Sequence, residues 1–257
     1  MKEFKIRASA IGEIMAGRIG ITEIQEEKVL ELKAKSLSKP LTPKQAEELQ
    51  KLVYKQEHPE LPAGAKSYCE KWLKEQIYGK KKEFTSKFTD KGNAVEHLAF
   101  DMIGRHLGVD AIKNDVYYDN EFIEGTPDIN TQELIDAKSS WDCFSFPLFE
   151  DEVPATDNYW QGQGYMDLTD KPNCKFVYVL CDTPESIIQR EARNYCFNNG
   201  FEVTPEIMEE MRERLTYSGI DDKYKIKVFD IARNSDDIQK IYDRVKMCRE
   251  YIKTIVV

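Results

Sequence analysis

The sequence predicts a mixed α/β (α+β) fold in which short strands lie between helical segments. Apolar residues recur at helical spacing through most of the N-terminal part of the chain and again near its end. The middle holds short β-prone runs, DVYYD, EFIEGTPDI and QELIDAKSS, separated by turn residues, which indicates a meander of strands. No internal repeat or low-complexity linker is visible, so we expect one domain over residues 1–257 with helical insertions.

The first segment, EFKIRASAIGEIMAG, predicts a short strand or extended entry followed by a helix. Ser9 is placed to cap this helix, because a serine side chain accepts a hydrogen bond from the free amides at a helix start. The helix then carries Ile11, Ile14 and Met15 as its apolar residues.

Two further helices are expected to form a hairpin over about residues 22–58. Thr22 and Gln25 have the spacing of a capping box, and Thr42 begins a second helix with proline in its first turn. The mixed charge of the segment indicates a solvated arm inserted into the domain.

The run GAKSYCEKWLKEQIYG continues as helix, with Gly79 as its C-cap. The segment from Asp90 to Gly108 is amphipathic and has Glu96 at the edge of its apolar face. We expect that face to hold Val95, Leu98, Ala99, Met102 and Ile103.

After the strands, TDNYWQGQGYMDL predicts a helix and KFVYVLC a buried strand. The runs PESIIQREARNYC and TPEIMEEMRERL predict a helical insertion at about residues 183–222. A strand, KYKIKVFDI, and a last helix, SDDIQKIYDRVKMCREYIK, follow.

The composition restricts the classes of function. A net charge of −9 argues against an indiscriminate nucleic-acid binder, because lysine and arginine drive phosphate binding. A local basic strip is still compatible with this total, and the candidate strip consists of Lys80, Lys81, Lys82, Lys87 and Lys91.

The six cysteines form no CxxC pair, so neither a zinc knuckle nor a disulfide framework is indicated, and we expect small, partly buried hydrophobic side chains. With no secretory signal and no long apolar run, we expect a soluble, intracellular protein without a membrane partner.

The residues that carry chemistry lie in the predicted strands. Asp136 and Lys138 form an Asp-x-Lys triplet, and positions two apart in a strand point to the same side. If the preceding strand pairs as a hairpin neighbour, Asp128 reaches the same point, and two carboxylates there need a cation. Mg²⁺ fits, since it prefers oxygen ligands and is usually held by one or two carboxylates plus substrate phosphate.

Such a site is suited to hydrolysis of a phosphodiester, with Lys138 positioning or deprotonating the water and stabilising developing charge. The alternative is an ordinary surface ion pair, since Asp-x-Lys is common in a chain with 32% charged residues. The neighbouring Leu134 and Ile135 favour a strand inserted into the core.

GTPDI followed by ELIDAKSS resembles the PD-(D/E)xK nuclease superfamily, with aspartate where glutamate is more frequent. This resemblance implies a restriction-endonuclease-like core, a central mixed sheet flanked by helices. KGNAVEHLAFD resembles the G-x-x-x-E helix of these proteins, which places a further acidic ligand at Glu96. YWQGQGYMDLT resembles the glutamine-bearing helix of the RecB-like branch, with Gln161 and Tyr165 in Q-x-x-x-Y spacing and Gln163 as the alternative glutamine.

The opening RASAIGEIMAG resembles the N-terminal segment of the lambda-exonuclease-like (YqaJ-type) viral recombinases, which implies that Arg7 and Ser9 bind a 5′-phosphate. The implied catalytic residues are Glu96, Asp128, Asp136, Lys138 and Gln161. The implied metal ligands, for one or two Mg²⁺ or Mn²⁺ ions, are Glu96, Asp128, Asp136 and the backbone carbonyl of Ala137.

The same resemblance implies a 5′-to-3′ exonuclease on linear double-stranded DNA that generates 3′ overhangs for phage-type recombination. The resemblance also implies a single-strand annealing protein as partner and a ring-shaped homotrimer as assembly. It implies a phage or prophage gene whose product acts in the cytoplasm of a bacterial host.

Two alternatives stay open. RecB-like or CRISPR-associated nucleases share the Q-x-x-x-Y helix, differ in polarity and commonly hold an iron–sulfur cluster. Cys174, Cys181 and Cys196 lack the tight pair that such a cluster uses, so we expect none. The other alternative is a catalytically silent DNA-binding module on the same fold, against which the joint presence of both aspartates and the lysine argues.

Overall fold

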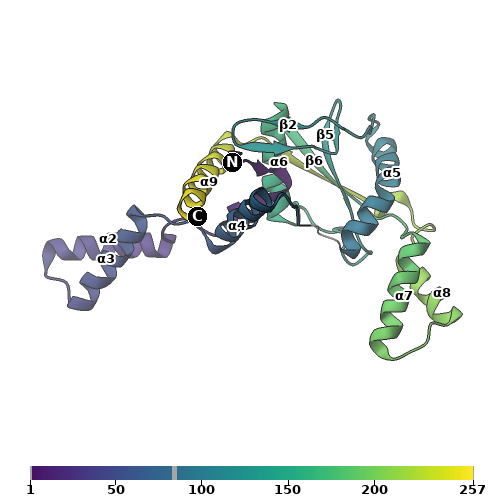
Figure 1. Ribbon diagram of the computed structural model, residues 1–257, viewed down its shortest axis with the longest axis horizontal. Helices are drawn as coiled ribbons and strands as arrows, with labels where there is room; N and C mark the ends of the chain where they lie inside the picture. The colour runs from purple at the N-terminus through teal and green to yellow at the C-terminus, as the bar shows by residue number, and fades with distance from the viewer. Residues whose placement is uncertain (1, 83–85, 257) are drawn as a thin grey trace.

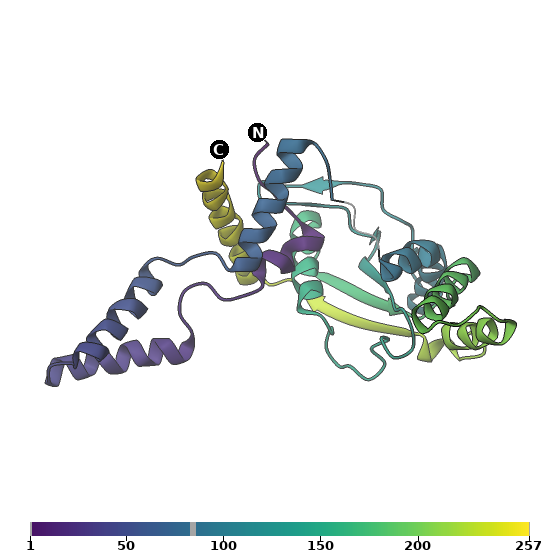
Figure 2. The same cartoon turned by 60° about the horizontal axis from the view of Figure 1, so that its bottom comes forward.

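The computed structural model describes residues 2–82 and 86–256. A body that contains the strands lies between two helical projections (Figure 1). One projection is the hairpin of α2, Glu23–Ser38, and α3, Pro43–Glu57. The other is formed by α7, Glu185–Asn199, and α8, Pro205–Leu215. Figure 2 shows the two projections extending from opposite ends of the body.

The strands divide between two sheets, which corrects the expectation of one continuous meander. The first sheet has the order β1-β3-β2, with β1 Ile6–Arg7, β2 Tyr118–Asp119 and β3 Ile123–Gly125. The second has the order β4-β5-β6-β7, with β4 Ile129–Asn130, β5 Leu134–Ser139, β6 Asn173–Val179 and β7 Ile226–Ala232. Pro127 stands between β3 and β4 and has no amide hydrogen for a ladder, which explains the break.

Within the second sheet, β5 and β6 run parallel, while the pairs β4–β5 and β6–β7 are antiparallel. Side chains alternate between its two faces. Phe176 and Phe229 pack towards α6, Thr156–Thr169, in the larger hydrophobic cluster. Val177 and Val179 pack towards α5, Lys87–Leu107. The sheet is therefore covered by helices on both faces.

The larger cluster also contains α4, Ala63–Tyr78, and α9, Ser235–Ile255, which pack against the short N-terminal helices. The predicted capping boxes at Thr22 and Thr42 are both present. Gly79 ends α4 with a φ of 61°, the left-handed conformation expected of a C-cap glycine.

Two predictions at helix starts and faces are wrong. Ser9 caps no helix: it lies inside the 3₁₀ turn η1, Ala8–Ala10, which runs directly into α1, Ile11–Met15. The helical chain begins earlier than the sequence pattern indicates, so Ser9 is left exposed in its first turn. Leu98 is 43% exposed, because the buried stripe of α5 runs through residues four apart and leaves Leu98 beside it.

Five of the six cysteines are buried and free, while Cys143 is free and exposed, contrary to the expectation for that residue. Among the described residues, no helix combines the length and the apolar character needed to cross a bilayer.

Candidate active site

The β4–β5 hairpin brings the two predicted aspartates together. Ile129 of β4 is paired with Ile135 of β5, so Asp128 and Asp136 stand at neighbouring positions of the same hairpin. The backbone amide of Ala137 donates a hydrogen bond of 2.9 Å to Oδ2 of Asp128. The carboxylate of Asp128 is thereby fixed beside the strand that carries Asp136.

Asp136 and Lys138 face the same side of β5, as the strand period predicts. Nζ of Lys138 lies 2.6 Å from Oδ2 of Asp136. Gln161 of α6 joins them: its Nε2 donates to Oδ1 of Asp136 at 2.7 Å, and its Oε1 accepts from Lys138 at 3.1 Å. The three side chains therefore form a closed network between the sheet and α6.

Gln161, and not Gln163, faces the aspartates. Nε2 of Gln163 donates to the carbonyl of Ala232 at 2.9 Å, and its Oε1 accepts from the amide of Asn234 at 2.8 Å. Tyr165 lies one turn after Gln161, with its hydroxyl 3.4 Å from Nε2 of that glutamine. The two glutamines point to opposite sides of α6, because residues two apart on a helix do not share a face.

Burial decides the electrostatics of the network. Asp136 is 2% exposed, and burial raises its pKa even though the charge of Lys138 opposes the shift. Burial and the neighbouring charge of Asp136 raise the pKa of Asp128 to about 7. For Lys138, burial lowers the pKa, but attraction to Asp136 outweighs it and the net shift is upward. The lysine therefore keeps its proton, and the two carboxylates are unfavourable as an isolated pair.

This arrangement fits a divalent cation. Oδ2 of Asp136 is buried and accepts no well-aligned hydrogen bond, although Lys138 lies close enough for an ion pair. Only one oxygen of Asp128 takes part in the hydrogen bond from Ala137. Carboxylate oxygens are the ligands that Mg²⁺ prefers, and a cation would offset both the burial of the two carboxylates and the charge of Asp136 that raises the pKa of Asp128.

Glu96 does not converge on this pair of aspartates. It lies on α5 in an ion pair with Lys113, and its charge contributes only slightly to the raised pKa of Asp128. Residues 2–82 and 86–256 contain no group of three or more histidine, cysteine, aspartate or glutamate side chains placed as metal ligands. The role of Glu96 and of the Ala137 carbonyl as ligands stays a prediction.

Arg7 and Ser9 lie in a separate cavity of about 430 Å³ beside this centre. Gly125, Thr126 and Tyr165 line the same cavity, and the Tyr165 hydroxyl donates to the carbonyl of Thr126 at 3.1 Å. Tyr165 thus links this cavity to Gln161. Nη2 of Arg7 is 3.1 Å from Glu75, whose side chain is 9% exposed.

The sequence interpretation overlooked Lys2 and Lys5, which line this cavity. A usable signal was present, because Lys5 and Arg7 stand two apart in an extended segment and share a side. Of the predicted basic strip, Lys81 lines the cavity, whereas Lys91 is completely buried in α5 and contributes nothing to a basic surface.

No protein-family model matches the sequence, and no curated protein does. Solved structures do match. The phage-related exonuclease from Haemophilus somnus 129PT is 24% identical, with a TM-score of 0.71 over 99% of this chain and 96% of that one. The alkaline exonuclease LHK-Exo from Laribacter hongkongensis is 14% identical, with a TM-score of 0.53 over 97% and 88% of the two chains.

A second structure of LHK-Exo, in complex with dAMP, gives a TM-score of 0.56 at the same identity. The fold class predicted from the sequence is therefore confirmed: the chain has the mixed α/β fold seen in these exonucleases, the class of structure that the sequence resemblance indicates.

Proposed function

We propose that this chain is a metal-dependent exodeoxyribonuclease that acts on the ends of linear double-stranded DNA. Its main support is the buried network of Asp136, Lys138 and Gln161 with Asp128 beside it. A purely structural strand gains nothing from two carboxylates with raised pKa values in its core. The similar folds belong to exonucleases, and one of them binds dAMP, a mononucleotide of the kind that exonucleolytic cleavage of DNA releases.

Asp128 and Asp136 would hold the metal, with Glu96 and the Ala137 carbonyl as further ligands and Mg²⁺ or Mn²⁺ as the ion, in one or two copies. Such an ion neutralises phosphate charge and makes a bound water more acidic. Glu96 has to leave Lys113 to take part, and its partly exposed position on α5 leaves room for that movement.

Lys138 supplies a fixed positive charge to the scissile phosphate. Its raised pKa keeps it protonated at neutral pH, so it acts as a hydrogen-bond donor that orients the water and stabilises developing negative charge. Gln161 positions this donor, because its amide holds Lys138 and Asp136 at the same time.

The cavity of Arg7 and Ser9 would receive the 5′-phosphate of the strand being cut. Lys81 would add positive charge, and Lys2 and Lys5 would do so by exchanging their ion pairs with Glu124 and Asp119 for the phosphate. Binding of a 5′-phosphate there favours 5′-to-3′ digestion, which leaves 3′ overhangs. In this proposal a single-strand annealing protein takes over the overhang during phage-type recombination in the bacterial cytoplasm, and three copies of the chain form a ring around DNA.

The first experiment compares digestion of a linear, 5′-phosphorylated duplex with that of closed circular DNA, with Mg²⁺ and with a chelator. We expect loss of the linear substrate only, and only with Mg²⁺. Asp136→Asn and Lys138→Ala should each lower the rate by roughly 100-fold or more. Lys175→Ala is the matched control, since Lys175 lies on the neighbouring strand but pairs with Asp230 at 2.5 Å.

Undiminished digestion by the Asp136 or Lys138 variant contradicts the assigned centre. Binding of linear DNA without digestion by the parent protein identifies a catalytically silent module instead.

The second experiment tests polarity and the 5′-phosphate site. Duplexes labelled at the 5′ or the 3′ end, with 5′-phosphoryl or 5′-hydroxyl termini, are digested by the parent and by Arg7→Gln. We expect early release of the 5′ label, faster digestion of phosphorylated ends, and loss of that preference in the variant. Equal rates on both kinds of end exclude the role given to Arg7 and Ser9.

A further inference from the structure

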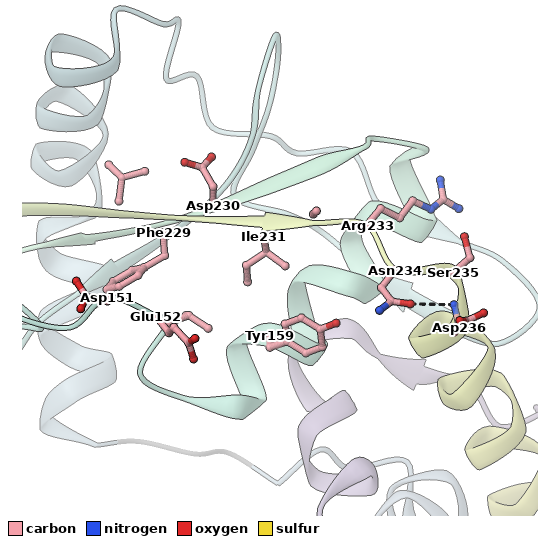
Figure 3. Close-up of a pocket in the computed structure, with 13 residues that line it drawn as sticks. Asp151, Glu152, Tyr159, Phe229, Asp230, Ile231, Arg233, Asn234, Ser235 and Asp236 are labelled. Atoms are coloured by element: carbon pink, nitrogen blue, oxygen red, sulfur yellow. Dashed lines mark hydrogen bonds between the residues drawn. The ribbon is translucent and has the colours of Figure 1, made fainter.

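A cavity of about 710 Å³ lies along β7, which is separated by β6 from β5, the strand that carries Asp136 (Figure 3). Residues 228–236 form one wall, and Asp151, Glu152 and Tyr159 contribute to the other. None of these residues belongs to the candidate active site or to the cavity of Arg7.

The cavity follows an open sheet edge. β7 is the last strand in the order β4-β5-β6-β7, and no other strand of the described residues pairs with its outer side. The carbonyl of Lys225 and the amide of Arg233 both bond to backbone that flanks β6. Alternate residues of an antiparallel strand bond to the same neighbour, so the amides and carbonyls of Val228 and Asp230 point away from β6.

The two faces of this edge differ in chemistry. Figure 3 shows Phe229 and Ile231 on one side of β7, towards Tyr159, and Asp230 on the other. Phe229 and Ile231 are 5% and 7% exposed, so the first side is an apolar floor. An added strand would place alternate side chains on such a floor while its backbone completes the ladder.

The negative charge of the cavity favours a positively charged binding partner. Asp151, Glu152 and Asp236 are exposed and form no ion pair with any described lysine or arginine. Arg233, the cation in the wall, is already paired with Asp170 at 2.6 Å and with Asp167. The carboxylates repel DNA phosphates and attract lysine and arginine side chains.

We propose that the outer edge of β7 binds an extended, lysine- or arginine-rich segment of a partner protein as an additional strand. The segment would bond through its backbone to Val228 and Asp230. Figure 3 shows Asp151 and Glu152 on the same side of β7 as Phe229, so the cationic side chains are the ones that lie over the floor, with their aliphatic parts on it and their charged ends near Asp151 and Glu152. The proposal does not depend on nuclease activity, because its test measures binding alone.

The test uses the full chain and a fluorescent, acetylated peptide as long as β7, in which valine and lysine alternate. Fluorescence anisotropy compares it with a valine–glutamate peptide of the same length. We expect the lysine peptide to bind and the glutamate peptide not to bind. Equal binding of both peptides overturns the charge assignment and with it the proposal.

Two variants separate the backbone and charge contributions. Val228→Pro removes an outward amide and leaves the bonds to β6 intact, so we expect the affinity to fall by about tenfold or more. The double variant Asp151→Asn/Glu152→Gln should weaken binding similarly, while Glu209→Gln/Glu210→Gln on the distant α8 should not. Unchanged affinity in Val228→Pro overturns the proposal.

A peptide N-methylated at alternate positions tests the same hydrogen bonds without altering the protein. It should bind at least about tenfold more weakly than the parent peptide, and equal binding refutes strand addition. Size-exclusion chromatography of the protein without peptide tests whether a second copy of this chain occupies the edge instead. If the parent self-associates and Val228→Pro dissociates it, the edge binds a second copy of this chain and the proposal is wrong.

Discussion

Lys91 is completely buried in α5, and we expect its replacement by methionine to stabilise the protein at neutral pH. Nζ of Lys91 donates a hydrogen bond of 2.8 Å to the carbonyl of Trp141, and it lies 5.9 Å from the ring centroids of Trp141 and Tyr217. Burial lowers the pKa of Lys91 from 10.5 to about 8, although Cys181, Asp142 and Asp182 oppose the shift. Methionine has a similar length and carries no charge to desolvate.

The magnitude follows from the pKa difference. The shift from 10.5 to about 8, at about 1.4 kcal/mol per unit, means that the buried charge lowers the free energy of unfolding by about 3 kcal/mol below pH 8. The unpaired Trp141 carbonyl in Lys91→Met costs about 1 kcal/mol. The free energy of unfolding of Lys91→Met should therefore exceed that of the parent by about 2 kcal/mol at neutral pH.

The sign of the pH dependence is fixed by which state binds the proton more tightly. Between about pH 8 and 10.5 the folded protein has released the Lys91 proton and the unfolded chain has kept it. The free energy of unfolding of the parent should therefore rise through this window relative to that of Lys91→Met. Below about pH 8, Lys91 is charged in both the folded and the unfolded state, so the buried charge destabilises the folded protein by its full amount.

The assay is denaturant unfolding of the parent and Lys91→Met at several values of pH from neutral to strongly alkaline. Titration of all other groups is common to both proteins and cancels in the difference. Lys87→Met, one turn earlier on α5 and exposed, is the matched control and should change the stability little. A parent-to-variant difference that stays constant across the window refutes the reasoning.

Further predictions concern packing and positioning. Gly164→Ala should lower the free energy of unfolding by about 1–3 kcal/mol, because the added Cβ would lie 2.3 Å from the buried Cδ1 of Ile11. A Cβ added at Gly92 has no atom within 4 Å, so Gly92→Ala should raise the free energy of unfolding by up to about 1 kcal/mol. Equal effects of the two substitutions in thermal denaturation would contradict this packing. Gln161→Ala should slow DNA digestion roughly 10- to 100-fold and alter its pH profile, whereas Gln163→Ala should chiefly lower the melting temperature; the reverse pattern excludes the assigned positioning role.

Local patterns explain which parts of the structure were predictable. The capping boxes at Thr22 and Thr42 involve residues three apart, so the sequence alone specifies their partners. The shared side of Asp136 and Lys138 follows from the strand period in the same way. The spacing of Gln161 and Tyr165 indicated a shared helix face and favoured Gln161, but the sequence left Gln163 open as the alternative.

Contacts between distant segments were not predictable. Glu96 has the expected spacing on α5, yet its carboxylate is paired with Lys113, a residue outside the helix. Lys91 belongs to a lysine-rich run by sequence, but the packing of α5 against Trp141 buries it. Ser9 matches a helix cap only if the helix starts after it, and the 3₁₀ turn before α1 removes that condition.

Neighbours along the chain were enough to predict most of the helices and to place an aspartate and a lysine on one side of β5, because these features depend on local spacing. The hairpin that brings Asp128 to the same point was a condition of that prediction, and the pairing of β4 with β5 meets it. Three features came from the packing of distant segments: Gln161 closes the network, the strands form two sheets, and no strand among residues 2–82 and 86–256 pairs with the outer edge of β7. Those features depend on which helix packs over which face, and that choice is made by the burial of the whole core.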